Sequence, residues 1–475
     1  MPGRYEYDAV VVGSGPNGLA AAITLAQEGF SVLVLEATQS IGGGMRSGEI
    51  TLPGYVHDIC SAIHPLAVAS PFFKKHNLFQ EGLEWIYPPA AVAHPLDDGT
   101  ALLLERSIEA TGETLGSDSG SYHDLMTSLV RNWDKLVHDV LGPLRFPRHP
   151  LVFMRFGLKA RLSAKSLAAS CYKAERARNL FAGIAAHSIL PFETLGSAAI
   201  GLILGAAGHA VGWPIAKGGS QKIADAMSAR LLALGGEITT EVTVRSMEDI
   251  PAARAVIFDV TPKQLAQIAG HRFPVEYHRR LEQHLPGPGV FKMDWALDGP
   301  IPWKSEQCAR AGTVHIGGTF DEIAEAERVV GQGEHPHKPF IILAQQSLFD
   351  STRAPAGKHT SWAYCHVPNG STIDMSDRIE SQIERFAPGF RDIVLARSCM
   401  SPMDMEAYNA NYIGGDIVGG IQSFSRLFVR PLGRFSAYST PSRGIYICSS
   451  SMPPGAGVHG MCGYYAARAA RRELS

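Results

Sequence analysis

Residues 8–36 decide the fold and begin Asp8-Ala-Val-Val-Val-Gly-Ser-Gly-Pro-Asn-Gly-Leu-Ala-Ala-Ala-Ile23. Residues 9–12 are a continuous apolar run, which is typical of a strand buried on both faces. A glycine-rich turn follows, and then a helical pattern that ends before Gly29. A second apolar run over residues 31–35 ends at Glu36. The stretch therefore predicts a strand, a tight turn, a helix and a second strand.

The three glycines of the turn have the spacing of a dinucleotide-binding loop. Gly13 permits the tight turn, Gly15 lets the backbone approach a pyrophosphate, and Gly18 lets the helix pack closely on the strand. The helix N-terminus offers unpaired N–H groups and the positive end of its dipole to the phosphates. Glu36 is placed to accept hydrogen bonds from both hydroxyls of an adenosine ribose, and its charge disfavours the 2′-phosphate of NADP.

Composition excludes several classes of protein. The 475 residues are enough for two or three sub-domains, and a net charge of −2 predicts no attraction to nucleic acid. The seven cysteines form no CxxC pair, so we expect neither a metal site nor a redox dithiol, and we expect a reducing, cytoplasmic location. No secretory signal is evident, and the apolar residues 195–208 are too few and too glycine-rich to span a bilayer. We expect a soluble protein.

The middle of the chain predicts a helical insertion that covers a ligand. Helical patterns dominate residues 87–211, as in residues 122–133 and 167–184. The Ser-, Gly- and Asp-rich residues 107–121 predict an exposed loop within it.

The α/β pattern returns at residue 212. It includes an alternating strand over residues 237–244 and a buried strand over residues 255–259. Longer alternating strands between residues 290 and 367 suit an antiparallel sheet with one face on a ligand cavity.

A second glycine turn lies close to the end of the sequence. A buried strand over residues 444–448 leads into Pro454-Gly-Ala-Gly-Val-His-Gly460, and a helical pattern starts at Met461. The start of a helix at such a turn is a second site that favours negative charge, and it suits the N1/O2 edge of a flavin, which becomes negative on reduction. We therefore predict that the two turns enclose one flavin nucleotide from opposite ends.

These segments, together with the Gly42-Gly43-Gly44 loop, resemble the phytoene dehydrogenase-like branch of FAD-dependent oxidoreductases, which shares a superfamily with the amine oxidases. Residues 212–220, 362–370 and 409–417 are similar to the subgroup called pyridine nucleotide-disulfide oxidoreductase domain-containing protein 2. Because the sequence has no active-site dithiol, disulfide chemistry is not expected.

The resemblance implies an α/β fold, with a Rossmann-like FAD-binding domain and a discontinuous substrate domain of antiparallel sheet plus helices. We expect the FAD-binding domain in residues 1–86, 212–270 and 405–475, and the substrate domain with its helical insertion in residues 87–211 and 271–404. The residues expected to hold FAD are Gly13, Gly15, Gly18, Glu36, Gly43, Arg46, Val242, Ser450, Gly457, Val458 and His459. Val242 would touch the adenine through its backbone.

The implied activity is hydride transfer between a small or apolar organic substrate and flavin N5, with oxygen or a quinone as the oxidant. His459 is the first candidate for the catalytic proton acceptor, and the alternative is that only its backbone matters. Asp294, Tyr364 and His366 are candidates to line the substrate cavity, with hydrogen bonding inside the core as the alternative.

Three other functions stay open at this point. The protein could be an FAD-dependent amine oxidase, a redox-neutral isomerase, or a non-catalytic binding protein like the GDP dissociation inhibitors, which share this architecture. The expected partner is a small molecule. Oligomeric state and peripheral membrane contact are left open.

Overall fold

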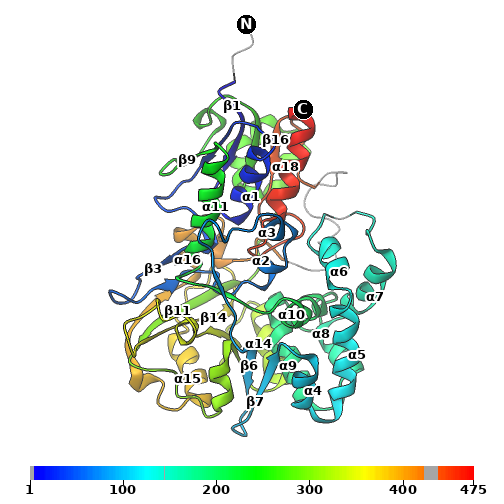
Figure 1. Cartoon of the computed structure of the whole chain (residues 1–475), viewed down its shortest axis with the longest axis vertical. Coiled ribbons are helices and arrows are strands. Elements are labelled where there is room, and N and C mark those ends of the chain that lie inside the picture. The colour runs from blue at the N-terminus through cyan, green and yellow to red at the C-terminus, as the bar shows by residue number, and fades with distance from the viewer. Residues whose placement is uncertain (1–4, 144, 422–436) are drawn as a thin grey trace.

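The structure is a computed structural model that describes residues 5–143, 145–421 and 437–475. Two large sheets organise these residues, one of five strands and one of seven. Figure 1 shows the five-stranded sheet in the upper half of the molecule and the seven-stranded sheet in the lower half. The functional site described below lies where residues of the two halves meet.

The five-stranded sheet is entirely parallel, in the order β16-β10-β1-β2-β9. Its strands are β1 (Tyr7–Val12), β2 (Val32–Leu35), β9 (Glu237–Thr239), β10 (Ala253–Phe258) and β16 (Ile445–Ile447). Every residue of β2 and β16 is buried, as expected for apolar strands that are covered by helices. The predicted Rossmann-like α/β unit is confirmed.

Helices α1 (Pro16–Ala26) and α18 (Met461–Leu474) pack side by side, although they come from opposite ends of the chain (Figure 1). Their contact needs Gly463, because a Cβ atom there would lie 1.7 Å from the carbonyl oxygen of Asn17. Helix α11 (Gln221–Ala233) packs on the other side of α1. Further helices of this half are α2 (Pro65–Ala69), α3 (Pro71–Lys75), α12 (Pro262–Ala269) and α13 (Val275–Glu282).

The strand predicted over residues 237–244 is shorter than expected, because β9 ends at Thr239. Glu241 has a φ of 62°, a left-handed conformation that no regular strand allows. The chain turns there, and the backbone N–H of Val242 donates to the carbonyl oxygen of Glu36 at 2.9 Å. Residues 240–244 therefore form a connection beside the end of β2.

The seven-stranded sheet has the order β15-β11-β14-β13-β12-β6-β7. Its neighbours are antiparallel except β6 and β12, which are parallel, so the predicted antiparallel sheet is in fact mixed at one pair. The parallel pair forms where the hairpin of β6 and β7, residues 90–105, joins the sheet beside β12. The strands are β6 (Ala90–Pro95), β7 (Ala101–Glu105), β11 (Gly289–Leu297), β12 (Ala311–Ile316), β13 (Ile341–Ala344), β14 (His359–Val367) and β15 (Val394–Met400).

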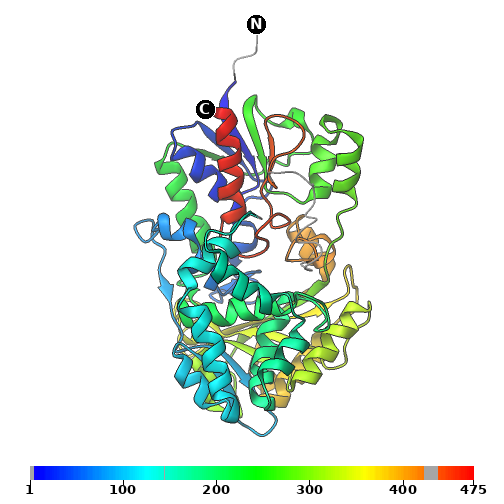
Figure 2. The same cartoon turned by 90° about the vertical axis from the view of Figure 1, so that its right-hand side faces the viewer.

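A layer of helices covers the middle and lower part of the side of the molecule that faces the viewer in Figure 2. It contains the predicted helical insertion. Its helices are α4 (Ile108–Glu113), α5 (Ser119–Val130), α6 (Trp133–Val140), α7 (Pro150–Ala160), α8 (Ala164–Cys171), α9 (Glu175–Ala185) and α10 (Ala198–Ala210). Helices α14 (Phe320–Gly331), α15 (Ser376–Phe386) and α16 (Pro402–Tyr408) complete the lower half.

Two local predictions in this layer are wrong. Residues 107–121 are helical instead of a loop, because Ser107 caps α4 by accepting a hydrogen bond from the backbone N–H of Ala110. The helical pattern over residues 167–184 is split into α8 and α9, since the carboxylate of Asp118 accepts hydrogen bonds from the backbone N–H groups of Lys173 and Ala174. In both places a side chain that binds the backbone decides the local structure.

Short strand pairs connect the two halves. They are β3 (Ser47–Gly48) with β4 (His57–Asp58), and β5 (Trp85–Ile86) with β8 (Ile215–Ala216). Within the described ranges, no helix combines the length and the apolar character needed to cross a membrane.

Candidate active site

A cavity of about 710 Å³ connects the two glycine turns with the seven-stranded sheet. One part is lined by residues at or beyond the carboxyl ends of β1, β2 and β10, which is where open parallel sheets bind their ligands. Another part is lined by side chains of β12, β13 and β14 and of helix α10. Gly13 and Gly15 from the first turn, and Gly457 and Val458 from the second, line this same cavity.

The Gly13 loop has the geometry that its sequence predicts. Gly13 has a φ of +102°, and a Cβ atom on Gly18 would lie 2.0 Å from the carbonyl oxygen of Gly13. A Cβ atom on Gly15 would meet the carboxylate Oδ2 of Asp259 at 2.8 Å. Helix α1 starts directly after Gly15, which gives no side-chain cap, and Gly15, Pro16 and Asn17 at its N-terminus line the cavity. In the first turn, the backbone N–H of Gly18 donates to the carboxylate of Asp259.

Glu36 lines the cavity as a buried carboxylate. Its Oε2 accepts from the backbone N–H and hydroxyl of Ser14, and its Oε1 accepts from the same two groups of Thr38. Burial would raise the pKa of Glu36, but these hydrogen bonds outweigh it and hold that pKa below its usual value. A ribose hydroxyl would have to replace one of the two side-chain hydroxyls, which rotate freely, whereas the backbone donors are fixed.

Arg46 and Gly43 lie beside this carboxylate. The Arg46 guanidinium lies 4.0 Å from Glu36 and stacks over the ring of Tyr408 at 4.8 Å. Its Nε is buried and has no hydrogen-bond partner among the described residues. Gly43 contacts the first loop, because a Cβ atom on it would lie 3.1 Å from the Cα of Gly15. The two N-terminal glycine loops therefore form one continuous wall of the cavity.

Val242 also lines the cavity, next to Glu36. Its backbone N–H is already bound to the Glu36 carbonyl oxygen, so only its carbonyl and side chain are left to contact an adenine.

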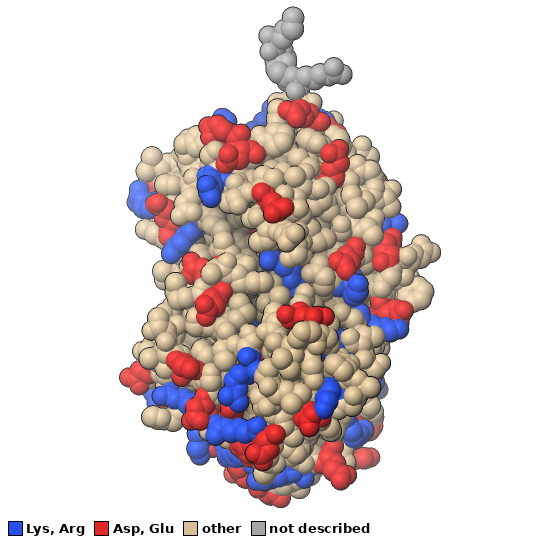
Figure 3. Space-filling view, turned by 90° about the vertical axis from the view of Figure 1, so that its left-hand side faces the viewer, with Lys and Arg blue, Asp and Glu red and all other residues tan. Residues whose placement is uncertain are grey.

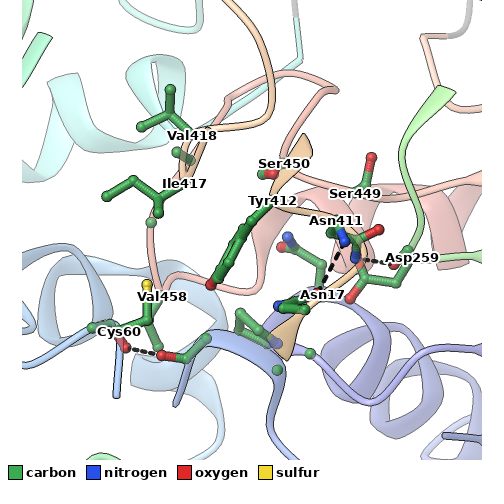
Figure 4. A pocket seen from close by; sticks show the side chains of 18 of the residues that line it. Asn17, Cys60, Asp259, Asn411, Tyr412, Ile417, Val418, Ser449, Ser450 and Val458 are labelled. Atoms are coloured by element: carbon green, nitrogen blue, oxygen red, sulfur yellow. Dashed lines mark hydrogen bonds between the residues drawn. The ribbon is translucent and has the colours of Figure 1, made fainter. Parts of the chain in front are cut away.

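Asp259 is a site residue that the sequence did not single out. It follows β10 directly, and its Oδ2 accepts a hydrogen bond from the backbone N–H of Gly18 at 2.9 Å. Its own carbonyl oxygen accepts from the side chain of Asn411 at 2.9 Å (Figure 4). Burial raises the pKa of Asp259 to about 7. An acid placed directly after a buried strand was the available signal.

Tyr412 is a second residue that the sequence did not single out. Figure 4 shows its ring projecting into the pocket between Ser450 and Cys60. Tyr412 belongs to the segment 409–417, which contributed to the resemblance but carried no expected role. Burial raises the pKa of its hydroxyl well above the usual value, so this group stays protonated.

Of the four residues predicted to bind FAD at the C-terminal turn, three line the cavity and one does not. Ser450, Gly457 and Val458 line the cavity, whereas the ring of His459 is buried outside the lining. His459 Nδ1 accepts from the backbone N–H of Met461 at 3.0 Å, so the Nε2, 3.1 Å from the Gly455 carbonyl oxygen, carries the proton. Burial lowers the pKa of His459 to about 4. This geometry favours the alternative in which the backbone of the turn matters and the imidazole holds the turn in place.

Among the three substrate-lining candidates, the structure brings only Tyr364 to the cavity. His366 Nδ1 lies 2.8 Å from the carboxylate of Glu327. Asp294 binds the ammonium group of Lys292 and lies 3.6 Å from His57, and burial raises the pKa of Asp294 to about 6. The side chains of His366 and Asp294 therefore form polar contacts inside the core and do not line the cavity.

The wall near Tyr364 is largely apolar. Trp362 lies beside Tyr364 on β14, with ring centroids 5.2 Å apart and an interplanar angle of 85°. His187 is one titratable group of the cavity lining, and its Nε2 lies 2.9 Å from the Nε2 of His315. Other residues of this wall are Ile200, Ile203, Leu204, Trp213, Thr313 and Ile342. No cluster of three or more candidate metal ligands occurs in the parts of the chain that the structure describes.

Comparisons with known proteins agree with this description. A model of the NAD(P)-binding Rossmann-like domain matches residues 11–75. A solved oxidoreductase from Methanosarcina mazei has a TM-score of 0.66 at 16% identity, covering 98% of this chain and 99% of its own. Putrescine oxidase with bound putrescine has a TM-score of 0.63 at 18% identity, covering 98% of each chain. The predicted Rossmann-like domain is confirmed, and the two solved structures are oxidoreductases by name.

The full-length relatives make the likeness more specific. Pyridine nucleotide-disulfide oxidoreductase domain-containing protein 2 of Mus musculus is 26% identical, over 99% of this chain and 94% of its own length. The protein of the same name from Rattus norvegicus matches over the same shares. The resemblance predicted from the sequence is thereby confirmed.

Proposed function

We propose that the protein is an FAD-dependent oxidoreductase that moves a hydride between an apolar organic substrate and flavin N5. The observation that carries this proposal is that two glycine turns, more than 400 residues apart, line one cavity. A dinucleotide is long enough to need both. A cavity of about 710 Å³ is also within the usual range of roughly 300–1,000 Å³ for cofactor sites.

The residues present fit FAD. The backbone of the Gly13 loop and the start of α1 would hold the pyrophosphate, and Glu36 would bind the ribose. Arg46 has a buried Nε that is free to donate to a ligand oxygen, as judged within the described ranges. The turn at Gly457 would lie at the flavin end, where backbone dipoles favour the negative charge of the reduced ring. These roles follow the predicted FAD-binding and substrate domains, which we retain as part of the proposal.

When bound, FAD supplies the hydride acceptor, and the chain contributes binding, orientation and exclusion of water. The apolar wall of α10 and β13, with Trp213, would hold an apolar substrate by burying its surface. Tyr364 and Tyr412 keep their hydroxyl protons and can donate hydrogen bonds into the cavity. The oxidant in this proposal is oxygen or a quinone, since the sequence has no second nucleotide motif.

An amine oxidase is the second candidate. The adjacent rings of Trp362 and Tyr364 line the cavity, and aromatic rings attract a substrate cation. The edge-to-face arrangement of these two rings, however, does not offer two parallel faces to one amine.

The test starts with the purified protein and its visible spectrum. We expect a flavin absorbance band, and FAD as the compound released on denaturation. The holoprotein is then mixed without oxygen with a polyene, a saturated acyl compound and an aliphatic amine. Bleaching of the flavin by one of the first two supports the proposal, and bleaching by the amine alone supports the second candidate. A protein that stays colourless when it is supplied with FAD overturns both.

A further inference from the structure

Helix α7 carries an apolar stripe on its solvent face. Leu151, Met154 and Leu158 are 70%, 54% and 54% exposed, and they follow the spacing i, i+3, i+7 that places side chains on one face of a helix. Phe146, four residues before the helix, is 83% exposed. Water therefore contacts four large apolar side chains within 13 residues of sequence.

The opposite face of α7 is firmly attached to the protein. Phe156 and Ala160 are buried, and Val152 and Phe153 pack against the hydrophobic core. Helix α7 packs against α10 and α6. The exposed stripe is thus an additional surface on an anchored helix, since the helix already has an apolar face for the core.

Cations surround this stripe. Residues 140–174 contain seven Lys and Arg residues and no Asp or Glu. Of these, Arg155 and Lys159 lie on the exposed side of α7 itself, next to the stripe. The other exposed cations of the segment are Arg145, Arg148, Arg161, Lys165 and Lys173.

Few acids neutralise these charges. Glu193 pairs with Lys165 at 3.1 Å, and the carboxylate of Asp139 accepts from the backbone N–H groups of Arg148 and His149. Arg155 and Arg161 form no ion pair with any residue that the structure describes. On the opposite side of the molecule, by contrast, acidic and basic side chains are interspersed (Figure 3).

We propose that Phe146 and helix α7 dock this protein on the surface of an anionic phospholipid bilayer. The helix would lie in the plane of the membrane, with its three apolar side chains among the acyl chains and the flanking cations at the lipid phosphates. This arrangement matches both features of the surface, because an apolar stripe needs a hydrocarbon phase and the unpaired cations need anions. A nucleic acid would use the cations and leave the apolar stripe in water.

The position of the surface is also suited to an apolar substrate, a point that rests on the proposed function. Helix α10 packs against α7 and contributes Ile200, Ile203 and Leu204 to the cavity wall. The helical layer seen in Figure 2 would therefore lie between the membrane and the cavity.

The experiment is sedimentation of the full-length protein with vesicles. We expect the wild type to pellet with phosphatidylcholine vesicles that contain phosphatidylglycerol, to remain in the supernatant with phosphatidylcholine alone, and to bind less at high salt. Replacing three cations (Arg155→Gln, Lys159→Gln, Arg161→Gln) should weaken partitioning by about 100-fold, at about fivefold for each charge. Replacing the stripe (Leu151→Ser, Met154→Ser, Leu158→Ser) should weaken it by at least about tenfold.

Matched controls separate these effects from general changes in charge and surface. Arg272→Gln, Arg280→Gln and Arg472→Gln remove three exposed charges elsewhere, and Leu232→Ser removes an exposed leucine from α11. Both control proteins should bind vesicles like the wild type. All variants should keep the flavin content and melting temperature of the wild type, so loss of vesicle binding is distinguishable from failure of the proposed function.

Three results would overturn the proposal. They are no pelleting of the wild type with anionic vesicles, equal losses in the control proteins, and vesicle binding that survives the change of the stripe. Binding to duplex DNA that depends on the cations alone would identify a nucleic acid as the occupant instead. A dimer in light scattering that dissociates when the stripe is changed would identify a second copy of the chain.

Discussion

The carboxylate of Asp259 accepts a hydrogen bond from the backbone N–H of Gly18 at 2.9 Å, across 241 residues of sequence. This bond joins the end of β10 to the first turn of α1 and helps to fix the glycine loop between them. The Asp259 carboxylate also fills the space where a side chain on Gly15 would lie. The conformation of the glycine loop therefore depends on the Asp259 carboxyl group as well as on the glycines themselves.

Gly15→Val should abolish retention of FAD while the chain still folds. A Cβ atom at this position would lie 2.8 Å from Asp259 Oδ2, and the larger branched side chain would extend into the space proposed for the pyrophosphate. The measurement is the flavin-to-protein ratio after purification, with circular dichroism as the folding check. Gly120→Val, on the exposed side of α5 with no atom within 4 Å of the added Cβ, is the matched control. Full flavin occupancy in the Gly15 variant would contradict the assignment of the loop.

Asp259→Asn should stabilise the cofactor-free protein at alkaline pH. The folded pKa of Asp259 is raised to about 7, so the folded state binds more protons than the unfolded state between pH 3.8 and about 7. The free energy of unfolding of the wild type consequently decreases as pH rises through this window. The uncharged side chain of the Asp259→Asn variant does not titrate, so this decrease is removed. We expect a gain on the order of 2 kcal/mol at pH 8 and little difference at pH 4. Melting curves at both values test this, with the exposed Asp392→Asn as control; parallel curves for Asp259→Asn and the wild type would refute it.

Arg353→Leu should destabilise the protein by about 3–5 kcal/mol. The Arg353 side chain is fully buried, and it lies 3.1 Å from Asp58 and 2.9 Å from Asp350. Its removal leaves the buried carboxylate of Asp58 without its cation. Arg328→Leu removes an exposed partner of Glu325 and should cost less than about 1 kcal/mol. Denaturant titration gives the change in the free energy of unfolding for each variant. Equal changes in the two variants would show that burial does not make the Arg353 ion pairs more important for stability than the exposed Arg328 pair.

Mild acid should unfold the protein because many histidines are buried in their neutral form. Burial lowers the pKa of seven of them below the usual 6.5: His57, His64, His76, His94, His209, His315 and His459. The unfolded chain takes up these protons first, so stability falls as pH decreases from 6.5 towards 4.

A single variant tests this explanation. The pKa of His94 is lowered to about 4, and its Nε2 lies 2.6 Å from the carbonyl oxygen of Gly318. His94→Gln keeps a donor for that oxygen and should reduce the stability lost between pH 7 and pH 5 by about 1–2 kcal/mol. The exposed His271→Gln should leave the loss unchanged. An unaltered loss in the His94 variant would mean that other groups cause the acid sensitivity.

Local sequence was enough for the parts of the site that depend on neighbouring residues. The run from β1 through α1 to Glu36 has its predicted form, because apolar runs, glycine spacing and a strand-end acid are all local signals. The turn at Gly457 lies on the same cavity for a similar reason, since it follows a buried strand of the same parallel sheet.

What the sequence did not reveal depends on contacts between distant residues. Asp259 lines the cavity because β10, which precedes it, pairs with β1 in the parallel sheet. Tyr412 lines the cavity because the segment after β15 and α16 returns to it. No local sequence pattern predicts either arrangement. His459 was expected at the flavin, whereas the structure places its ring outside the cavity lining, where its Nδ1 accepts a hydrogen bond from the backbone N–H of Met461. The basic, apolar surface of α7 was also missed, because the same residues satisfy an ordinary helix pattern with one buried face.

The order of the parallel sheet has a consequence for synthesis on the ribosome. The first strand made, β1, lies between β2 and β10, and β10 acquires its outer neighbour β16 only when residues 445–447 have appeared. Helix α18, which covers α1, follows still later. Under the proposed function, the site cannot be complete on a growing chain before residues 445–474 have appeared, and a chain cut before Ile445 would contain only one of the two glycine turns that line the cavity.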